Sequence, residues 1–182
     1  MQNTMPSIRI RAGSIVVCLS LALAAMLLEK HYHQQPTVTA PRTNAKTPEQ
    51  ILASMQVPPG NSPTHSTLVK ALTRAGRLPN DSNSWTMLGD ALAQCVRDTN
   101  NQAYYSQAEL AYRCALQLDS HNLGALTGLA WVDGGRHLFQ QSVAWANKAL
   151  EVAPDDPTAY GVLGDAELEL GDYDQALHHY QK

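Results

Sequence analysis

Apolar residues recur at helical spacing in the last part of the chain and are interrupted by one sharp turn. In residues 157–180, Tyr160 and Leu163 lie three positions apart, and Ala176 and Tyr180 lie four positions apart. Residues at these spacings share one face of an α-helix. Gly171, between the two blocks, is the residue type that most often ends a helix. The pattern therefore predicts two amphipathic helices joined by a tight turn.

Two earlier stretches carry weaker versions of the same pattern. In residues 123–156 the matching positions are Leu126, Leu129, Ala130, Phe139, Ser142, Ala146, Ala149 and Pro154. In residues 82–122 they are Trp85, Leu88, Gly89, Leu92, Tyr105, Ala108, Tyr112 and Ala115. The second block of this first copy comes seven residues late. Because surface loops tolerate insertions, we expect residues 95–102 to enlarge a loop between the two helices.

This pattern resembles the tetratricopeptide repeat, which carries Trp-x2-Leu-Gly-x2-Tyr, then Ala-x3-Phe, then Pro over about 34 residues. The Leu-Gly pair occurs at 88–89 and again at 163–164. The resemblance implies an all-α fold, an α-solenoid of antiparallel helix pairs. Its three units would cover residues 82–122, 123–156 and 157–182, with the insertion in the first and the last one incomplete. A single unit cannot bury its apolar stripe alone, so we expect the array to continue beyond Lys182.

The segment before the repeats divides into three parts. Residues 1–30 contain Arg9 and Arg11, followed by an uncharged apolar run over 12–28. A basic start before an apolar run predicts an export signal. Residues 31–46 are polar and contain two prolines, which is typical of a flexible tether. Residues 47–80 predict short helices near 48–56 and 65–75, which we interpret as a degenerate leading half-repeat.

The apolar run of 17 residues is close to the shortest length that crosses a bilayer. We favour an uncleaved anchor, which makes the chain a single-pass membrane protein. The arginines before the run place the following residues on the exported side, periplasmic or extracellular. Cleavage of a signal peptide after Ala24, giving a secreted protein, is the alternative.

Charge and motifs exclude several classes of function. The net charge is −3 and the 13 basic residues form no run, which argues against nucleic acid as the main partner. No nucleophile-and-base motif, phosphate loop or zinc signature is present, so we expect no enzyme activity and no cofactor. Adjacent His178 and His179 point in different directions on a helix, so we expect no metal site. Cys95 and Cys114 fit unpaired core residues better than a disulfide, which remains the alternative.

The resemblance also implies where a partner binds. In tetratricopeptide arrays the first helices of the units line a groove that holds a peptide segment. The matching positions here give six candidate groove residues, namely Thr86, Asp90, Thr127, Trp131, Asp165 and Glu169. The Lys, Arg and Asn clamp that holds a terminal carboxylate in some members is absent. An acidic, glycine-rich groove suits a neutral or basic segment with an apolar anchor, and Trp131 either faces that groove or packs between repeats.

These observations favour a non-catalytic scaffold for protein–protein interaction. The combination of an anchor and exported repeats is similar to bacterial cytochrome c maturation and envelope assembly factors. By this analogy the chain would bind a protein or peptide partner and would reach the membrane through its N-terminal segment. The alternative is an N-terminal recognition module of a longer enzyme whose catalytic residues lie beyond position 182.

Overall fold

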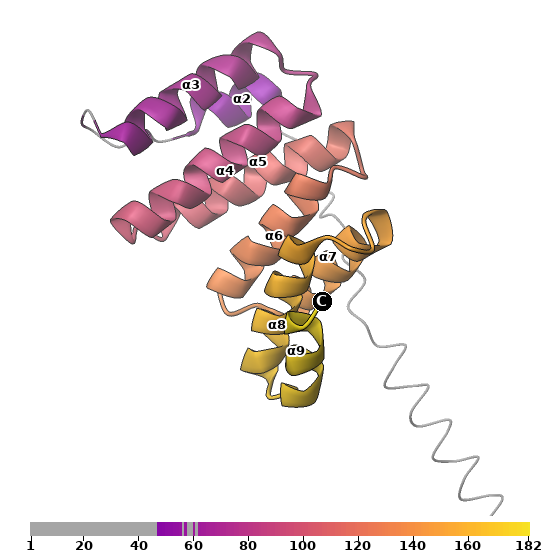
Figure 1. Ribbon diagram of the computed structural model, residues 1–182. Helices are drawn as coiled ribbons and strands as arrows, with labels where there is room; N and C mark the ends of the chain where they lie inside the picture. Colours follow the sequence, from indigo (N-terminus) through magenta and orange to yellow (C-terminus); the bar gives the residue numbers. More distant parts are fainter. Residues whose placement is uncertain (1–46, 56, 58–59, 61) are drawn as a thin grey trace, which may run out of the picture. The chain divides into compact units, whose positions relative to one another are not determined.

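A computed structural model describes residues 47–55, 57, 60 and 62–182, and regular structure within this part is entirely helical (Figure 1). The helices are α2 (Pro48–Ala53), α3 (Pro63–Arg77), α4 (Ser82–Thr99), α5 (Ala103–Leu118), α6 (Leu123–Gly135), α7 (Phe139–Val152), α8 (Pro157–Leu170) and α9 (Tyr173–Tyr180). The all-α prediction is confirmed. The apolar segment 1–30 and the tether 31–46 lie outside the described residues.

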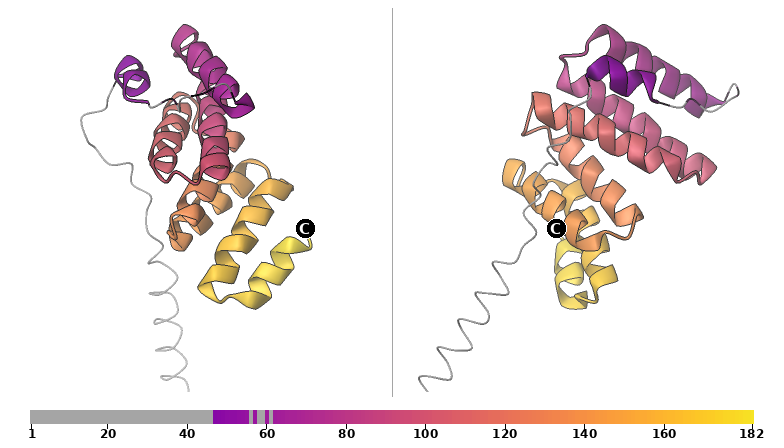
Figure 2. Two further views of the ribbon diagram at one scale, coloured as in Figure 1. Left: turned by 90° about the vertical axis from the view of Figure 1, so that its left-hand side faces the viewer. Right: turned by 180° about the vertical axis from the view of Figure 1, so that it is seen from behind.

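The helices pack as consecutive pairs that stack on one another. The pairs are α4 with α5, α6 with α7 and α8 with α9, and each pair meets the next through α5–α6 and α7–α8 (Figures 1 and 2). The first helices of neighbouring pairs, α4 with α6 and α6 with α8, are also in contact. Ahead of the pairs, α3 packs against α4 and buries Leu68, Ala71 and Ala75. This arrangement is the predicted α-solenoid.

The extra residues of the first unit lengthen helices and do not form the enlarged loop that we expected. Helix α4 has 18 residues, against 13 in α6 and 14 in α8, and only residues 100–102 separate it from α5. Cys95 and Val96 on α4 and Tyr104 on α5 are buried. The added turns therefore bury apolar surface, which stabilises them as helix. The helix ends at Thr99 and is capped by Asn100, which adopts a left-handed conformation with φ 51°.

One aromatic side chain joins the first two units. The ring of Tyr112, on α5, lies between Gly89 on α4 and Gly128 on α6. A Cβ atom at Gly89 would lie 2.4 Å from the ring, and one at Gly128 would lie 2.3 Å from it. In the second unit, Ala146 occupies the position equivalent to Tyr112, and Ala130 occupies the position equivalent to Gly89. The repeat therefore tolerates either one tyrosine between glycines or a set of small side chains.

The start of α6 is tied to α4 through a buried asparagine. The Oδ1 atom of Asn122 accepts hydrogen bonds from the backbone N–H of Ala125 at 2.9 Å and from Oγ1 of Thr86 at 3.0 Å. Its Nδ2 group donates to Oγ of Ser82 at 2.7 Å. One side chain thus caps a helix and satisfies two hydroxyl groups of the preceding unit.

We expect Asn122→Ala to lower the free energy of unfolding by about 2 kcal/mol, because it removes a helix cap and the hydrogen bonds that join the start of α6 to Ser82 and Thr86 of α4. Asn101→Ala is the matched control, since Asn101 is exposed and makes one local bond at the start of α5. The control should lose about 0.5 kcal/mol. Urea unfolding followed by circular dichroism measures both, and equal losses would show that the bonds between α6 and α4 add nothing.

Candidate functional site

The six candidate residues all lie on the helices that touch one another across successive units. Thr86 and Asp90 are on α4, Thr127 and Trp131 are on α6, and Asp165 and Glu169 are on α8. The predicted groove therefore corresponds to a continuous row of first helices. No observation tests whether these residues contact a ligand, so their role remains a prediction.

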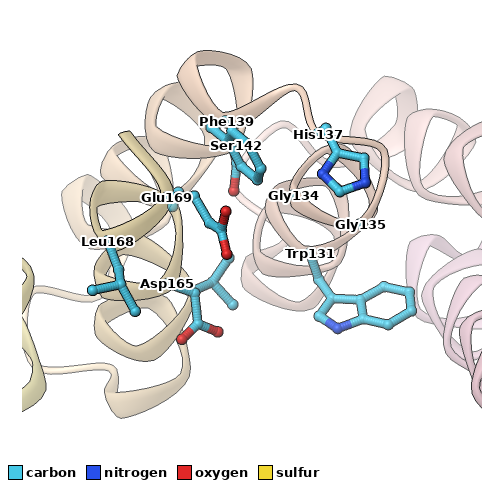
Figure 3. A pocket seen from close by; sticks show the side chains of 11 residues that line it. Trp131, Gly134, Gly135, His137, Phe139, Ser142, Asp165, Leu168 and Glu169 are labelled. Atoms are coloured by element: carbon cyan, nitrogen blue, oxygen red, sulfur yellow. The ribbon is translucent and has the colours of Figure 1, made fainter. Parts of the chain in front are cut away.

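A cavity of about 320 Å³ lies between α6, the beginning of α7, and α8. Figure 3 shows its lining. The lining residues are Trp131, Gly134, Gly135, His137, Phe139, Ser142, Val162, Asp165, Ala166, Leu168 and Glu169. Three of the six candidates therefore meet at one cavity, and the other three do not line it.

The three candidates outside the cavity make contacts within the protein. Oγ1 of Thr86 donates to Asn122, as described above, and Oγ1 of Thr127 donates to the carbonyl oxygen of Leu123 at 3.0 Å. Asp90 accepts a hydrogen bond from the hydroxyl group of Tyr112 at 2.9 Å. Partial desolvation raises the pKa of the Asp90 carboxyl group, and the bond from Tyr112 opposes this shift. These contacts give all three side chains a structural role.

Trp131 combines the two roles that its sequence position left open. It lines the cavity, yet its indole points away from Asp165 and Glu169 (Figure 3). The ring lies 5.5 Å from the ring of Tyr105, which belongs to the preceding unit, and the guanidinium carbon of Arg97 lies 5.0 Å from the indole centre. The indole therefore packs against the preceding unit, and the guanidinium group of Arg97 makes a cation–π contact with it.

The α8 side of the cavity is acidic. Asp165 accepts a hydrogen bond from the hydroxyl group of Tyr180 at 2.8 Å. Desolvation and this bond raise the pKa of Tyr180 to about 12. Glu169 is exposed and forms no hydrogen bond or ion pair with any described residue. No lysine or arginine is among the lining residues, so this wall carries uncompensated negative charge.

Sequence reasoning missed the wall that the α6–α7 connection provides. His137, in that connection, has a left-handed backbone with φ 61°, and the N–H of Leu138 donates to the carbonyl oxygen of Asp133 at 2.8 Å. This turn brings His137 and Phe139 to the cavity. The signal was the Gly134-Gly135 pair, which predicts the end of the helix but not the direction in which the chain leaves it.

Three further expectations bear on chemistry and location. Within the described part of the chain, no group of three or more His, Cys, Asp or Glu residues is placed to hold a metal ion. Cys95 and Cys114 are free and buried, and burial raises the pKa of the Cys114 thiol to about 11. Among the described residues, no helix has the length and apolar character needed to cross a membrane.

Comparisons with known proteins place the fold. No family model matches the chain. Over 107 residues the chain is 31% identical to the formate-dependent nitrite reductase complex subunit NrfG of Escherichia coli O157:H7, a match that covers 57% of this chain and 50% of NrfG. The chain thus spans about half the length of this curated relative. Two crystal structures of MamA each superpose with a TM-score of 0.55 at 16% identity. They cover 65% of this chain and 61% and 65% of their own chains.

Stacked helix pairs with small residues where the helices meet define an α-solenoid, and the MamA structures share this fold. The likeness to NrfG and the fold shared with MamA support the resemblance of these repeats to the tetratricopeptide repeat. The resemblance seen in the sequence is therefore confirmed.

Proposed function

We propose that this chain is a non-catalytic scaffold that binds an extended segment of a partner protein along α4, α6 and α8. The observation that carries the proposal is the cavity between α6 and α8, where Trp131, Asp165 and Glu169 meet. A concave site with apolar walls and a few polar groups is the usual form of a binding site. Tetratricopeptide arrays are typically interaction modules.

The comparison with NrfG supports a role in assembling a complex. NrfG is named as a subunit of a nitrite reductase complex, and it shares 31% identity with this chain over 107 residues. We propose that the present chain likewise acts in a protein complex, and the predicted export signal before the repeats leads us to propose that it is an assembly factor of the cell envelope. The partner is a protein, and its recognised segment is neutral or basic.

A single pair of variants tests the groove. Leu168 lines the cavity and is 45% exposed, whereas Leu118, at the end of α5, does not line the cavity and is 44% exposed. We expect the full chain, immobilised in detergent, to retain specific members of a random peptide library. Leu168→Gln should weaken the binding of the retained peptides about tenfold, because apolar burial is lost. Leu118→Gln should leave their affinity unchanged. Peptide binding is measured by fluorescence anisotropy.

Two outcomes would contradict the scaffold proposal. If no peptide were retained by the wild-type chain, the groove would not bind extended segments. If Leu168→Gln and Leu118→Gln had equal effects, the bound surface would not be the one formed by α4, α6 and α8. Circular dichroism of both variants checks that the fold is kept.

We further propose that residues 12–28 anchor the protein in a membrane, with the repeats on the exported side. The support is the basic, then apolar, order of the N-terminal residues. Cell fractionation should recover the protein with membranes, and its intact mass should retain the residues before Ala25. A mature protein that begins at Ala25 would refute the anchor and support secretion.

A further inference from the structure

Two carboxylates lie on the same face of α8 at the cavity. Asp165 and Glu169 are four residues apart, so their side chains lie one above the other on the helix. Like charges at this spacing repel each other. The lining contains no arginine or lysine that would relieve the repulsion, and His137 is its only side chain that can become cationic.

Neighbouring acidic side chains have partners in the protein, in contrast to Glu169. Glu167, on the same helix, lies 2.7 Å from Nδ1 of His179. Glu109 pairs with Arg113 at 2.8 Å and with Arg136 at 2.7 Å. Within the described part of the chain Glu169 has no such partner, and its carboxylate is therefore accessible to a cation from outside.

The apolar part of the cavity fits the stem of a long side chain. Leu168 is exposed, and Val162, Ala166 and Phe139 complete an aliphatic and aromatic wall beside the two carboxylates. Lysine and arginine carry an apolar stem and a charged head, so they match both parts. The volume of about 320 Å³ is at the lower end of the roughly 300–1,000 Å³ range of ligand pockets. It suits one side chain better than a folded element.

We propose that this cavity is a pocket for one basic side chain of the partner segment. The stem lies along Leu168 and the cation binds Asp165 and Glu169. The proposal rests on the proposed function only for the source of that side chain. An apolar side chain would leave both carboxylates uncompensated, and an acidic one would be repelled.

Arg97 is the only arginine on α4, α6 and α8, and its guanidinium group has partners away from the two carboxylates. Arg97 donates from Nε and Nη2 to Oε1 of Gln94, at 3.0 and 2.8 Å, and lies over the indole of Trp131. The indole points away from the carboxylates (Figure 3). Arg97 therefore does not pair with Asp165 or Glu169, and these carboxylates can bind a cation from a partner.

The test uses the ¹⁵N-labelled full chain in detergent micelles. The probe is Nα-acetyl-arginine methylamide, and its citrulline analogue is the neutral probe of nearly the same shape. We expect the arginine probe to shift the amide signals of Gly134 and Gly135 in a saturable way, and the citrulline probe to bind at least about fivefold more weakly. This difference reflects the loss of a charge-assisted hydrogen bond.

Two variants of the cavity lining and one control variant test where the arginine probe binds. Glu169→Gln and Asp165→Asn should each weaken arginine binding by about tenfold while keeping the shape of the side chain. Asp165→Asn also keeps an acceptor for Tyr180. Glu151→Gln is the matched control, because Glu151 is an exposed acid of α7 that does not line the cavity, and the change in net charge is the same. Its binding should equal that of the wild type.

Each failure has its own meaning. Equal binding of both probes, no shift at Gly134 and Gly135, or an equal loss in Glu151→Gln would overturn the basic-side-chain pocket. Peptides that are retained without enrichment of lysine or arginine would overturn it as well, while the scaffold function stands. Binding of the arginine probe by a chain that retains no peptide would instead overturn the proposed function and support the pocket.

Discussion

Tyr112→Ala should lower the free energy of unfolding by about 4 kcal/mol, within the usual range for truncating a buried aromatic residue. The side chain is fully buried between α4 and α6, and it comes from α5, so three helices border the space that would be left. Glycines on both sides have no side chains that could fill it. Because the helices are held by their other contacts, the space can collapse only in part.

Tyr112→Phe separates the contribution of the ring to stability from that of the hydroxyl group. The phenylalanine ring keeps the packing against Gly89 and Gly128 and loses only the bond to Asp90. We expect a loss of about 1 kcal/mol, as for one hydrogen bond. Urea unfolding followed by circular dichroism measures both variants. If the two variants lost equal stability, the hydrogen bond to Asp90, and not the packing of the ring between the units, would account for the stabilisation.

Gly128→Ala should lower the free energy of unfolding by about 3 kcal/mol, at the upper end of the usual cost of overpacking. The new methyl group would lie 2.3 Å from Cζ of Tyr112. The ring cannot move away, because Gly89 holds it from the opposite side at an equally short distance. The helices must therefore separate, and their other contacts weaken.

Gly161→Ala is the control for the helical preference of alanine. No atom lies within 4 Å of a Cβ at Gly161, which is also inside a first helix. We expect this variant to gain about 0.5–1 kcal/mol, because alanine favours helix over glycine. Thermal melting of the two variants should shift in opposite directions. A shift in the same direction would show that the Tyr112 contact does not limit the approach of the helices.

The repeat architecture could be predicted because its physical cause is local in the sequence. The Leu-Gly pairs at 88–89 and 163–164 indicate close helix contacts, and Gly89 and Gly164 both lie against a tyrosine of the paired helix. The length of α4 could not be predicted in the same way. Residues 95–102 are mostly polar and suggest a loop, and the burial of Cys95 and Val96 depends on neighbouring helices.

Part of the candidate site could also be predicted, because that part depends only on residues within one repeat. The resemblance assigns Asp165 and Glu169 to the groove, and helical phase places both on one face of α8. The direction of the Trp131 indole depends on Tyr105 of another unit, and the wall at His137 depends on a left-handed turn. Neither is encoded by the spacing within one repeat.

The hydroxyl groups of Tyr112 and Tyr180 have a consequence for protein engineering. Both tyrosines belong to second helices, yet their hydroxyl groups end on Asp90 and Asp165 of the first helices. A graft of the groove onto a consensus solenoid that copied only α4, α6 and α8 would transfer the carboxylates without their donors. The recipient must also receive the two tyrosines, since the surface that we propose for recognition depends on side chains from both layers of the array.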